Sequence, residues 1–389
     1  MTSRASEIGL SNEARPPAAA YFHVPFCAHR CGYCDFTLIA GRDDLVGDYL
    51  RSLDLEIQRS RIPLGTPLAT LFFGGGTPTH PEPAEMRRLF EMTRRYFHVS
   101  ATTEFSVEAN PLDLTDEKID LLTEMGVNRI SLGVQSFSQQ ALKLLERDHC
   151  AHDVRDVMAR LKSRFENVSL DLIFGVPNQT LPDWKETLER AIELGPSHIS
   201  TYGLTFEKGT AFWTRRERGD ISAVDEELER EQYALAMEQL PAAGYEQYEI
   251  SNFAKPGFEC RHNNVYWNGD EYWAFGPGAA RYMNGRRETN IRSVLGWLAR
   301  LERNESPVAD SEELDREHRA RELIYLGLRR IRGISRASFY EQTGFELDEL
   351  CGPSLREQVQ LGLLDDDGSY VRLTLEGRFV ADRVVMEFL

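Results

Sequence analysis

The sequence predicts an α/β protein in which parallel strands alternate with helices and curve into an incomplete barrel. Two observations lead to this fold class. Short runs rich in Val, Ile, Phe and Tyr recur along the first half of the chain, and amphipathic stretches separate them. A chain of 389 residues is long enough for roughly two to three domains. Its 41% hydrophobic and 28% charged residues are typical of a globular protein.

Six runs are expected to form the strands of this barrel. They are residues 21–26, 70–73, 104–108, 129–134, 168–174 and 198–204. Apolar residues at helical spacing predict helices between them, at residues 45–57, 114–125 and 184–194. In barrels of this kind the chemistry collects on the loops that follow the carboxyl ends of the strands. We therefore expect the functional site there.

The pattern of the sequence changes after the sixth strand and defines the domain organisation. We expect residues 1–17 to form a flexible tail and 18–225 to form the barrel core. Residues 226–305 form an extension that begins with a long helix at 225–243 and continues rich in Tyr, Trp, Asn and Gly. Residues 306–389 form a small winged-helix-like domain, with helices at 316–331 and 335–343 and a strand at 370–375.

Charge and hydropathy exclude two classes of partner. The chain has 45 Lys and Arg against 62 Asp and Glu, a net charge of −17 that repels nucleic acid. No window approaches the roughly 18 consecutive apolar residues that a membrane helix needs. The opening residues, MTSRASEIGL, lack the apolar centre of a signal peptide. We expect a cytoplasmic protein without a transmembrane segment or bound nucleic acid.

Half of the cysteines lie in one loop directly after the first strand. These are Cys27, Cys31 and Cys34, whereas Cys150, Cys260 and Cys351 stand alone. Without a signal peptide, crowded thiols indicate metal binding rather than disulfides. Three thiolates in a short loop can hold a four-iron cluster and leave one iron open. Structural zinc normally takes four protein ligands. The alternatives are a zinc site completed by His23 or His29, and three unligated thiols.

The spacing Cys-x3-Cys-x2-Cys, with Tyr33 before the last Cys, resembles the signature of the radical S-adenosylmethionine (SAM) superfamily. This resemblance implies a partial (β/α)6 barrel, similar to a TIM barrel, with a C-terminal α+β extension. It also implies a [4Fe-4S] cluster whose open iron binds S-adenosylmethionine. The resemblance narrows to oxygen-independent coproporphyrinogen oxidases and their relatives over about residues 20–205. It is carried by HVPFC, FGGGTPT, VEANP, RISLGVQSF, Arg147-Asp-His149 and DLIFGVP.

By this resemblance several positions fall on contacts to S-adenosylmethionine. They are Tyr21, Tyr33, Gly75, Gly76, Thr77, Glu108, Gln135, Arg147, Asp171, Gly203 and Ala280. Arg147 would pair with a carboxylate, Asp171 and Glu108 would accept hydrogen bonds from hydroxyls, and Tyr33 would pack on adenine. In the oxidases some of these positions contact a second bound S-adenosylmethionine. The sequence does not decide whether this chain binds one or two molecules of S-adenosylmethionine.

Two departures separate this chain from the true oxidases. They carry a further Cys two residues after the third, where this chain has Phe36, and a longer arm before the first strand. The Cys-Asp-Phe step instead resembles the related haem chaperone family, HemW. The resemblance therefore implies a protein without catalytic residues of its own.

The second motif of that family is His-Asn-x-x-Tyr-Trp, here residues 262–267. Neutral imidazole is a common axial ligand of haem iron, and aromatic rings can cover the macrocycle. By residue type alone, a His beside a Trp is more often structural than a ligand. The resemblance implies haem binding by His262, Asn263, Tyr266 and Trp267. Members of the family often have a His after a Gly-x-Gly-Ala run. In this chain the run is Gly276-Pro-Gly-Ala279, and Ala280 follows it.

The predicted function is that of a haem chaperone, which binds haem and transfers it to an acceptor, such as a respiratory haem protein of the membrane. The cluster and S-adenosylmethionine would organise the transfer of haem. They could do so by causing the protein to form a homodimer. Three alternatives stay open. They are a coproporphyrinogen III oxidase of porphyrin biosynthesis, another radical methylase or haem-degrading relative, and a scaffold with zinc in the cysteine loop.

Overall fold

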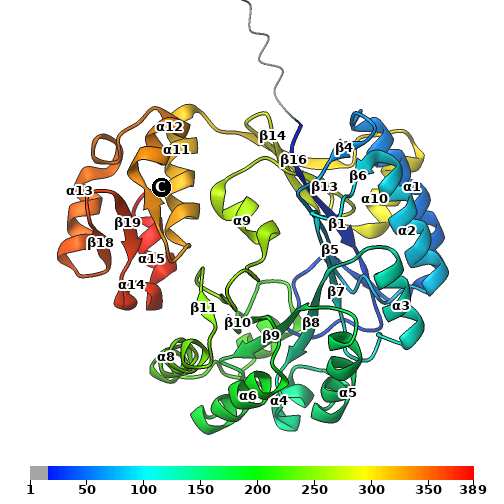
Figure 1. Ribbon diagram of the computed structural model, residues 1–389, viewed down its shortest axis with the longest axis horizontal. Coiled ribbons are helices and arrows are strands. Elements are labelled where there is room, and N and C mark those ends of the chain that lie inside the picture. Colours follow the sequence, from blue (N-terminus) through cyan, green and yellow to red (C-terminus); the bar gives the residue numbers. More distant parts are fainter. Residues whose placement is uncertain (1–15) are drawn as a thin grey trace, which may run out of the picture.

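A nine-stranded sheet forms the centre of the computed structural model, which describes residues 16–389 (Figure 1). The predicted tail, 1–17, lies almost wholly outside the described residues. The order of the strands is β11-β12-β10-β9-β8-β7-β5-β1-β13. Their bounds are β1 Ala19–Val24, β5 Thr70–Gly75, β7 Glu104–Ala109, β8 Arg129–Gln135, β9 Asn167–Phe174, β10 His198–Gly203, β11 Glu246–Gln247, β12 Asn252–Ala254 and β13 Trp273–Phe275.

The six predicted strands are confirmed, and they are parallel to one another in the order of the chain, from β1 to β10. Strand β13, which the sequence analysis did not identify, pairs in parallel with β1 at one end of the sheet. At the other end β12 and β11 run antiparallel to their neighbours. The sheet curves, as Figure 1 shows, but its two end strands do not pair, so the barrel is open.

Helices cover the convex face of this sheet (Figure 1). They are α1 Val46–Arg59, α2 Pro83–Tyr96, α3 Asp116–Glu124, α4 Gln139–Leu144, α5 Ala151–Lys162, α6 Leu181–Leu194, α8 Glu226–Ala242 and α10 Val294–Glu302. Their apolar stripes meet the strands in one continuous core, in which Leu53, Phe73 and Trp184 have no exposed surface. Thr180 precedes the first residue of α6 and caps the helix, because its hydroxyl accepts from the Asp183 N–H while the Asp183 carboxylate accepts from the Thr180 N–H.

Helix α9 (Arg261–Asn268) lies in the hollow on the concave side of the sheet (Figure 1). It contacts β5 on one side and α11 on the other. The buried Glu104 carboxylate at the start of β7 accepts hydrogen bonds from the backbone N–H groups of Arg261 (3.0 Å) and His262 (2.9 Å). This carboxylate satisfies donors that the first turn of a helix otherwise leaves unpaired, and so anchors α9 to the sheet.

Short elements complete the barrel region. They are β2 Phe26–Cys27, β3 Ile39–Ala40, the 3-10 turn Asp43–Leu45, β4 Thr66–Pro67, β6 Phe97–His98 and α7 Ala211–Glu217. A separate antiparallel sheet contains β14 Ala280–Met283, β15 Arg286–Asn290 and β16 Val308–Glu313. Because β16 pairs with β15, the residues directly after the expected boundary at 306 belong to this sheet.

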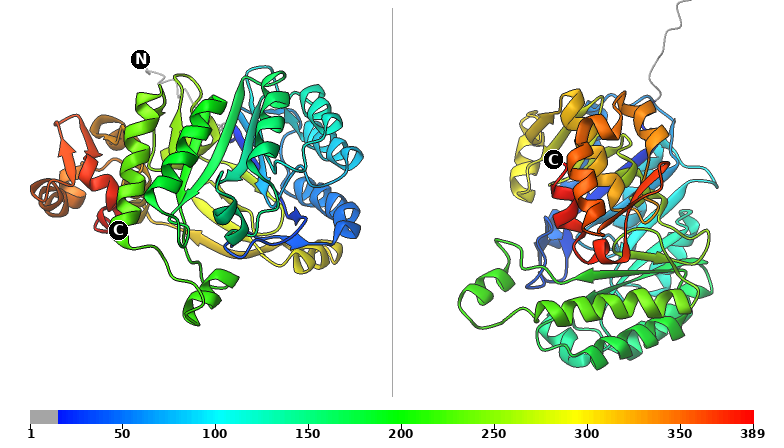
Figure 2. Two further views of the ribbon diagram at one scale, coloured as in Figure 1. Left: turned by 90° about the horizontal axis from the view of Figure 1, so that it is seen from below. Right: turned by 90° about the vertical axis from the view of Figure 1, so that its left-hand side faces the viewer.

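The C-terminal unit has its own core and packs at one end of the barrel, where Figure 2 shows it in orange and red. Its elements are α11 Arg316–Leu328, β17 Ile334–Ser335, α12 Arg336–Thr343, α13 Leu347–Gln360, β18 Leu364–Asp366, β19 Tyr370–Leu373, α14 Leu375–Phe379 and α15 Ala381–Met386. Three helices precede a β-hairpin in a three-stranded sheet, which is a winged-helix-like order. Within residues 16–389 no helix combines the length and the apolar content that crossing a bilayer requires.

Candidate functional site

A cavity of about 350 Å³ opens where the parallel strands end. The cysteine loop after β1 forms one wall, and residues at the ends of β5, β7, β8, β9 and β10 form the others. The predicted residues that line it are Cys27, Cys31, Tyr33, Cys34, Gly75, Gly76, Thr77, Glu108, Gln135, Arg147, Asp171 and Gly203. Residues far apart in the sequence meet here because the carboxyl ends of parallel strands lie at the same edge of the sheet.

The three thiols of the cysteine loop are unpaired and face this cavity. A turn in which the Cys34 N–H donates to the Cys31 carbonyl (3.1 Å) curls the loop. The Cys27 Sγ lies 3.3 Å from the Thr77 hydroxyl, and the Arg147 guanidinium lies 3.8 Å from the Cys31 Sγ. Burial raises the pKa of the Cys27 thiol to about 12. Binding of a cation by this loop therefore has to displace the thiol proton.

The glycine run after β5 lets the cysteine loop approach the sheet closely. Gly75 has φ of 106°, and a Cβ there would overlap the His23 ring. A Cβ on Gly76 would lie 2.8 Å from the carbonyl oxygens of Val24 and Phe26. The Gly75 N–H points to the Glu108 carboxylate, which it reaches at 3.0 Å. Only glycine fits at these two positions, as the sequence analysis expected for a close backbone approach.

Two half-buried carboxylates, those of Glu108 and Asp171, line the cavity. Burial, followed by the charge of Asp171, raises the pKa of Glu108 to about 7. Burial also raises the pKa of Asp171, although its carboxylate accepts hydrogen bonds from the hydroxyls of Ser131 (2.9 Å) and Ser200 (2.8 Å). Both groups are placed to accept hydrogen bonds from the hydroxyls of a bound molecule.

Arg147 supplies positive charge to the same cavity. One of its guanidinium nitrogens donates to the Gly133 carbonyl (2.8 Å), while its buried Nε has no partner within the described residues. An unpartnered buried donor is rare in proteins, and an anionic ligand would satisfy it. Nearby Gln135 has φ of 64°, a strained conformation that recurs at functional sites.

Two of the residues predicted to contact S-adenosylmethionine do not line this cavity. Tyr21 points into the hollow beside α9, where its hydroxyl lies 3.0 Å from His23 Nδ1 and its ring stacks on Phe72. Ala280 begins β14 and pairs with Thr289 in the separate antiparallel sheet. In this structure neither residue contacts the space between the cysteine loop and the strand ends.

The residues predicted to bind haem do not form one open pocket. His262 is 1% exposed, and its two ring nitrogens are hydrogen-bonded to the hydroxyls of Thr70 (2.8 Å) and Tyr266 (2.9 Å). Burial lowers the pKa of His262 to about 3, so the imidazole is neutral. Trp267 lines a different cavity, of about 270 Å³, against the C-terminal unit. Asn263 lies on the same helix, half-buried.

Ser131 and Tyr202 are among the side chains that line the first cavity and that the sequence analysis did not predict as site residues. A signal for Ser131 was present, because alternate residues of a strand face the same side. Ser131 lies two residues before Gly133 and four before Gln135, both of which line the cavity. No comparable pattern marked Tyr202, which is 41% exposed near the end of β10.

Comparison with known proteins agrees with this architecture. The radical SAM superfamily profile matches residues 21–191, and the HemN C-terminal domain profile matches residues 314–380. The structure resembles the solved structure of coproporphyrinogen III oxidase (HemN) from Escherichia coli, with a TM-score of 0.84. The match covers 96% of this chain and 91% of the oxidase chain. At 23% identity this likeness concerns the fold.

Several relatives match nearly the full length. The heme chaperone HemW of Bacillus subtilis is 38% identical over 374 residues, which cover 95% of this chain and 99% of that protein. The heme chaperone HemW of Escherichia coli is 33% identical, with 96% and 98% covered. A bovine protein named radical S-adenosyl methionine domain-containing protein 1, mitochondrial, is 32% identical, with 96% and 87% covered. This chain belongs to the radical SAM family whose members carry the name heme chaperone HemW.

Proposed function

We propose that this protein binds haem and passes it to an acceptor protein. The observation that carries the proposal is the near full-length similarity to relatives named heme chaperone, at up to 38% identity. Phe36 supports it further, because this residue stands where the resemblance to coproporphyrinogen oxidases requires another Cys. The cysteine loop of this chain thus has three thiols and lacks the further Cys of the coproporphyrinogen oxidases.

The residues of the first cavity fit the two cofactors that the family implies. Cys27, Cys31 and Cys34 would hold a [4Fe-4S] cluster, since three soft sulfur ligands lie in one loop at the cavity wall. Arg147 would pair with the carboxylate of S-adenosylmethionine, and Glu108 would accept hydrogen bonds from its ribose. Such a cluster can supply an electron to the sulfonium of bound S-adenosylmethionine. The residues of the chain bind the two cofactors and orient them.

Cysteine variants test the cluster. After anaerobic reconstitution we expect about four iron atoms per chain and broad visible absorption in the wild type. Cys27→Ser should lose most of both. Cys351→Ser is the matched control, because that buried thiol belongs to the C-terminal core and should leave the iron content unchanged. Equal iron in both variants would contradict the assignment of the loop.

A transfer assay tests the carrier function. Haem-loaded protein is mixed with an apo haem protein, and the Soret band of the acceptor is followed. We expect faster transfer than from a haem-loaded albumin, and slower transfer from Cys27→Ser protein. A wild type that binds no haem would contradict the proposal. Anaerobic conversion of coproporphyrinogen III would then support the oxidase alternative.

The prediction that His262 ligates haem iron needs its own test. In this structure both of its nitrogens are occupied, so ligation requires that the bond to Thr70 or Tyr266 breaks. If His262 is the ligand, His262→Ala should shift or abolish the Soret band. Tyr266→Phe frees one imidazole nitrogen and should then strengthen binding. An unchanged spectrum in both variants would place haem elsewhere.

The remaining parts of the proposal concern the cell compartment, the acceptor of haem and the oligomeric state of the protein. We place it in the cytoplasm, with a respiratory haem protein of the membrane as acceptor, and we propose that a homodimer forms when the cofactors are bound. Light scattering of the reconstituted protein, with and without S-adenosylmethionine, tests the dimer. A monomer under all conditions would exclude it.

A further inference from the structure

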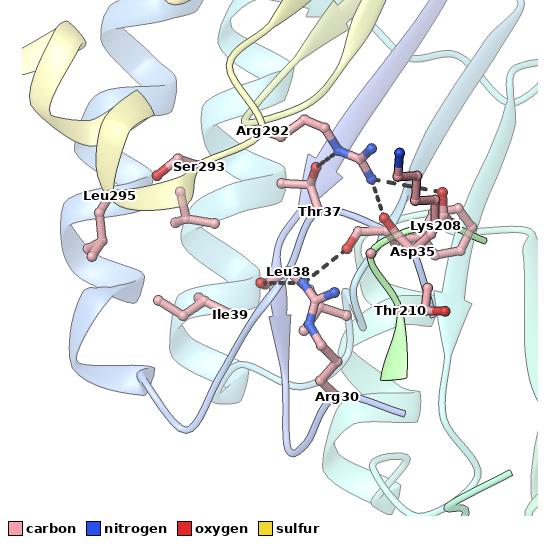
Figure 3. A pocket seen from close by; sticks show the side chains of 13 residues that line it. Arg30, Asp35, Thr37, Leu38, Ile39, Lys208, Thr210, Arg292, Ser293 and Leu295 are labelled. Carbon is pink, nitrogen blue, oxygen red and sulfur yellow. Dashed lines mark hydrogen bonds and ion pairs between the residues drawn. The ribbon is translucent and has the colours of Figure 1, made fainter. Parts of the chain in front are cut away.

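A second cavity, of about 470 Å³, adjoins the one that the cysteines line (Figure 3). We name it the cationic groove and define it by Arg30, Phe36, Lys208, Arg292 and Leu295. The loop after Cys34, the segment after β10 and the start of α10 form its walls. The two cavities share residues of the loop, including Phe36. A molecule in the groove would therefore lie at the mouth of the cysteine-lined cavity.

The groove concentrates positive charge on a chain whose net charge is −17. It has three cationic side chains and a single carboxylate, that of Asp35. Arg30 donates only to backbone carbonyls, those of Cys34, Phe36 and Leu38. These bonds fix the guanidinium in place without neutralising it.

Of the other two cations, Arg292 has one carboxylate near it, that of Asp35, and Lys208 has none among the described residues. The Arg292 guanidinium lies 3.9 Å from the Asp35 carboxylate and donates to the Thr37 hydroxyl at 3.3 Å, as Figure 3 shows. Lys208 lines the groove on the side of the segment after β10. Arginine and lysine in such positions are typical binding groups for carboxylates. The groove is thus prepared for a ligand with more than one negative charge.

Apolar side chains stand beside these cations and are open to solvent. Phe36 is 57% exposed and Leu295 is 51% exposed, while Leu38 and Ile39 line the same groove. Exposed apolar groups next to a set of convergent polar groups are typical of small-molecule sites, whose volumes are about 300–1,000 Å³. A planar apolar ring that carries two carboxylates matches both features.

We propose that this groove is the haem site, with the ring against Phe36 and Leu295 and the propionates on Arg30, Lys208 and Arg292. The inference rests on the proposed carrier function and gives that function a location. Compared with the buried His262, the groove accepts a ligand without the loss of internal hydrogen bonds. Bound there, haem would lie beside the loop of the three cysteines, which explains how the cofactors of that loop could control its release.

The experiment is an absorbance titration of reconstituted protein with two probes, haem and haem dimethyl ester, which lacks the propionate charges. In the wild type, haem should bind at least tenfold more tightly than the ester. The double variant Lys208→Ala, Arg292→Ala should lose that preference, while its affinity for the ester stays unchanged. Phe36→Ala should weaken binding of both probes.

Matched controls separate the possible outcomes. Arg51→Ala removes an exposed arginine of α1, outside the groove, and should behave as the wild type. Circular dichroism and iron content check the folding of each variant. If the double variant keeps the preference for haem over the ester, the groove is not the site, although the carrier function stands. If the wild type binds no haem at all, the carrier function itself fails.

Discussion

At the scale of single residues, Glu56 links the stability of the barrel to pH. Its carboxylate is 2% exposed and accepts hydrogen bonds from the Gly276 N–H (2.9 Å), the Asn290 amide (2.6 Å) and the Trp297 indole (3.2 Å). Burial nevertheless raises its pKa from 4.5 to about 7. Because the folded pKa exceeds the unfolded one, the stability that the protonated form contributes is complete below about pH 4.5 and is lost as the pH rises through about 7.

Urea unfolding of the wild type and Glu56→Gln at pH 5 and pH 8 tests this prediction. The free energy of unfolding of the wild type, relative to the variant, should fall by on the order of 2 kcal/mol between the two pH values. The comparison cancels other titrating groups, such as Glu108, which both proteins share. A difference that does not change with pH would show that Glu56 keeps one charge state throughout.

Residues of the site differ in how well the sequence predicts them. The three loop cysteines and most of the predicted S-adenosylmethionine contacts line the first cavity, because they follow strands whose ends converge. His262 is different, since its surroundings come from Thr70, 192 positions away along the chain. No pattern near residue 262 reveals that partner. Residue type alone favoured a structural His there, and both of its nitrogens have structural hydrogen bonds.

At the scale of elements, the junction between α9 and α11 gives a second prediction. Gly269 follows the last residue of α9 and has φ of 70°, and a Cβ there would overlap the Leu323 side chain of α11. Gly244 is a matched control, because it has φ of 88° but no atom within 4 Å of its ideal Cβ. Gly244→Ala should therefore cost only the backbone strain, about 1 kcal/mol. Gly269→Ala should cost about 1–3 kcal/mol more in the free energy of unfolding.

Chemical denaturation of both variants measures the difference directly. Equal costs at the two positions would mean that the Leu323 and Arg319 side chains move aside at Gly269 without a loss of packing. A larger cost at Gly244 would contradict the open surroundings of that glycine. Far-ultraviolet circular dichroism confirms that each variant retains its helices.

Elements were predictable where burial leaves a periodic signal. The six parallel strands are buried apolar runs, and their helices carry apolar stripes, so both appear in the sequence. The sheet β14-β15-β16 escaped prediction because β14 and β15 are mostly half-buried, β16 is mostly exposed, and charged residues dominate RRETN in β15 and VADSEE in β16. Strand β13 has only three residues, and its place beside β1 depends on a pairing across some 250 positions.

At the scale of the whole molecule, the protein has two separate apolar cores that polar contacts join. The barrel has one continuous apolar core, whereas the C-terminal unit has a separate one. Polar contacts connect them at the surface, among them the ion pair of Arg230 with Glu376 (2.8 Å) and the Arg329 guanidinium that lies over the Trp267 ring. Contacts of this polar kind are weaker than an apolar core and are screened by salt.

Hydrogen exchange should therefore separate the two cores. Amides of β8 and β9 should exchange most slowly, and those of α14 and β19 faster, with a further increase in 1 M salt. Arg230→Ala should accelerate exchange in α14 even at low salt, because it removes both the pair with Glu376 and the contact of the guanidinium with the Phe379 ring. Arg87→Ala breaks a pair of similar exposure, with Glu124 inside the barrel, and should leave α14 unchanged. Uniform protection of both cores, unaffected by salt, would show instead that the molecule opens as a single cooperative unit.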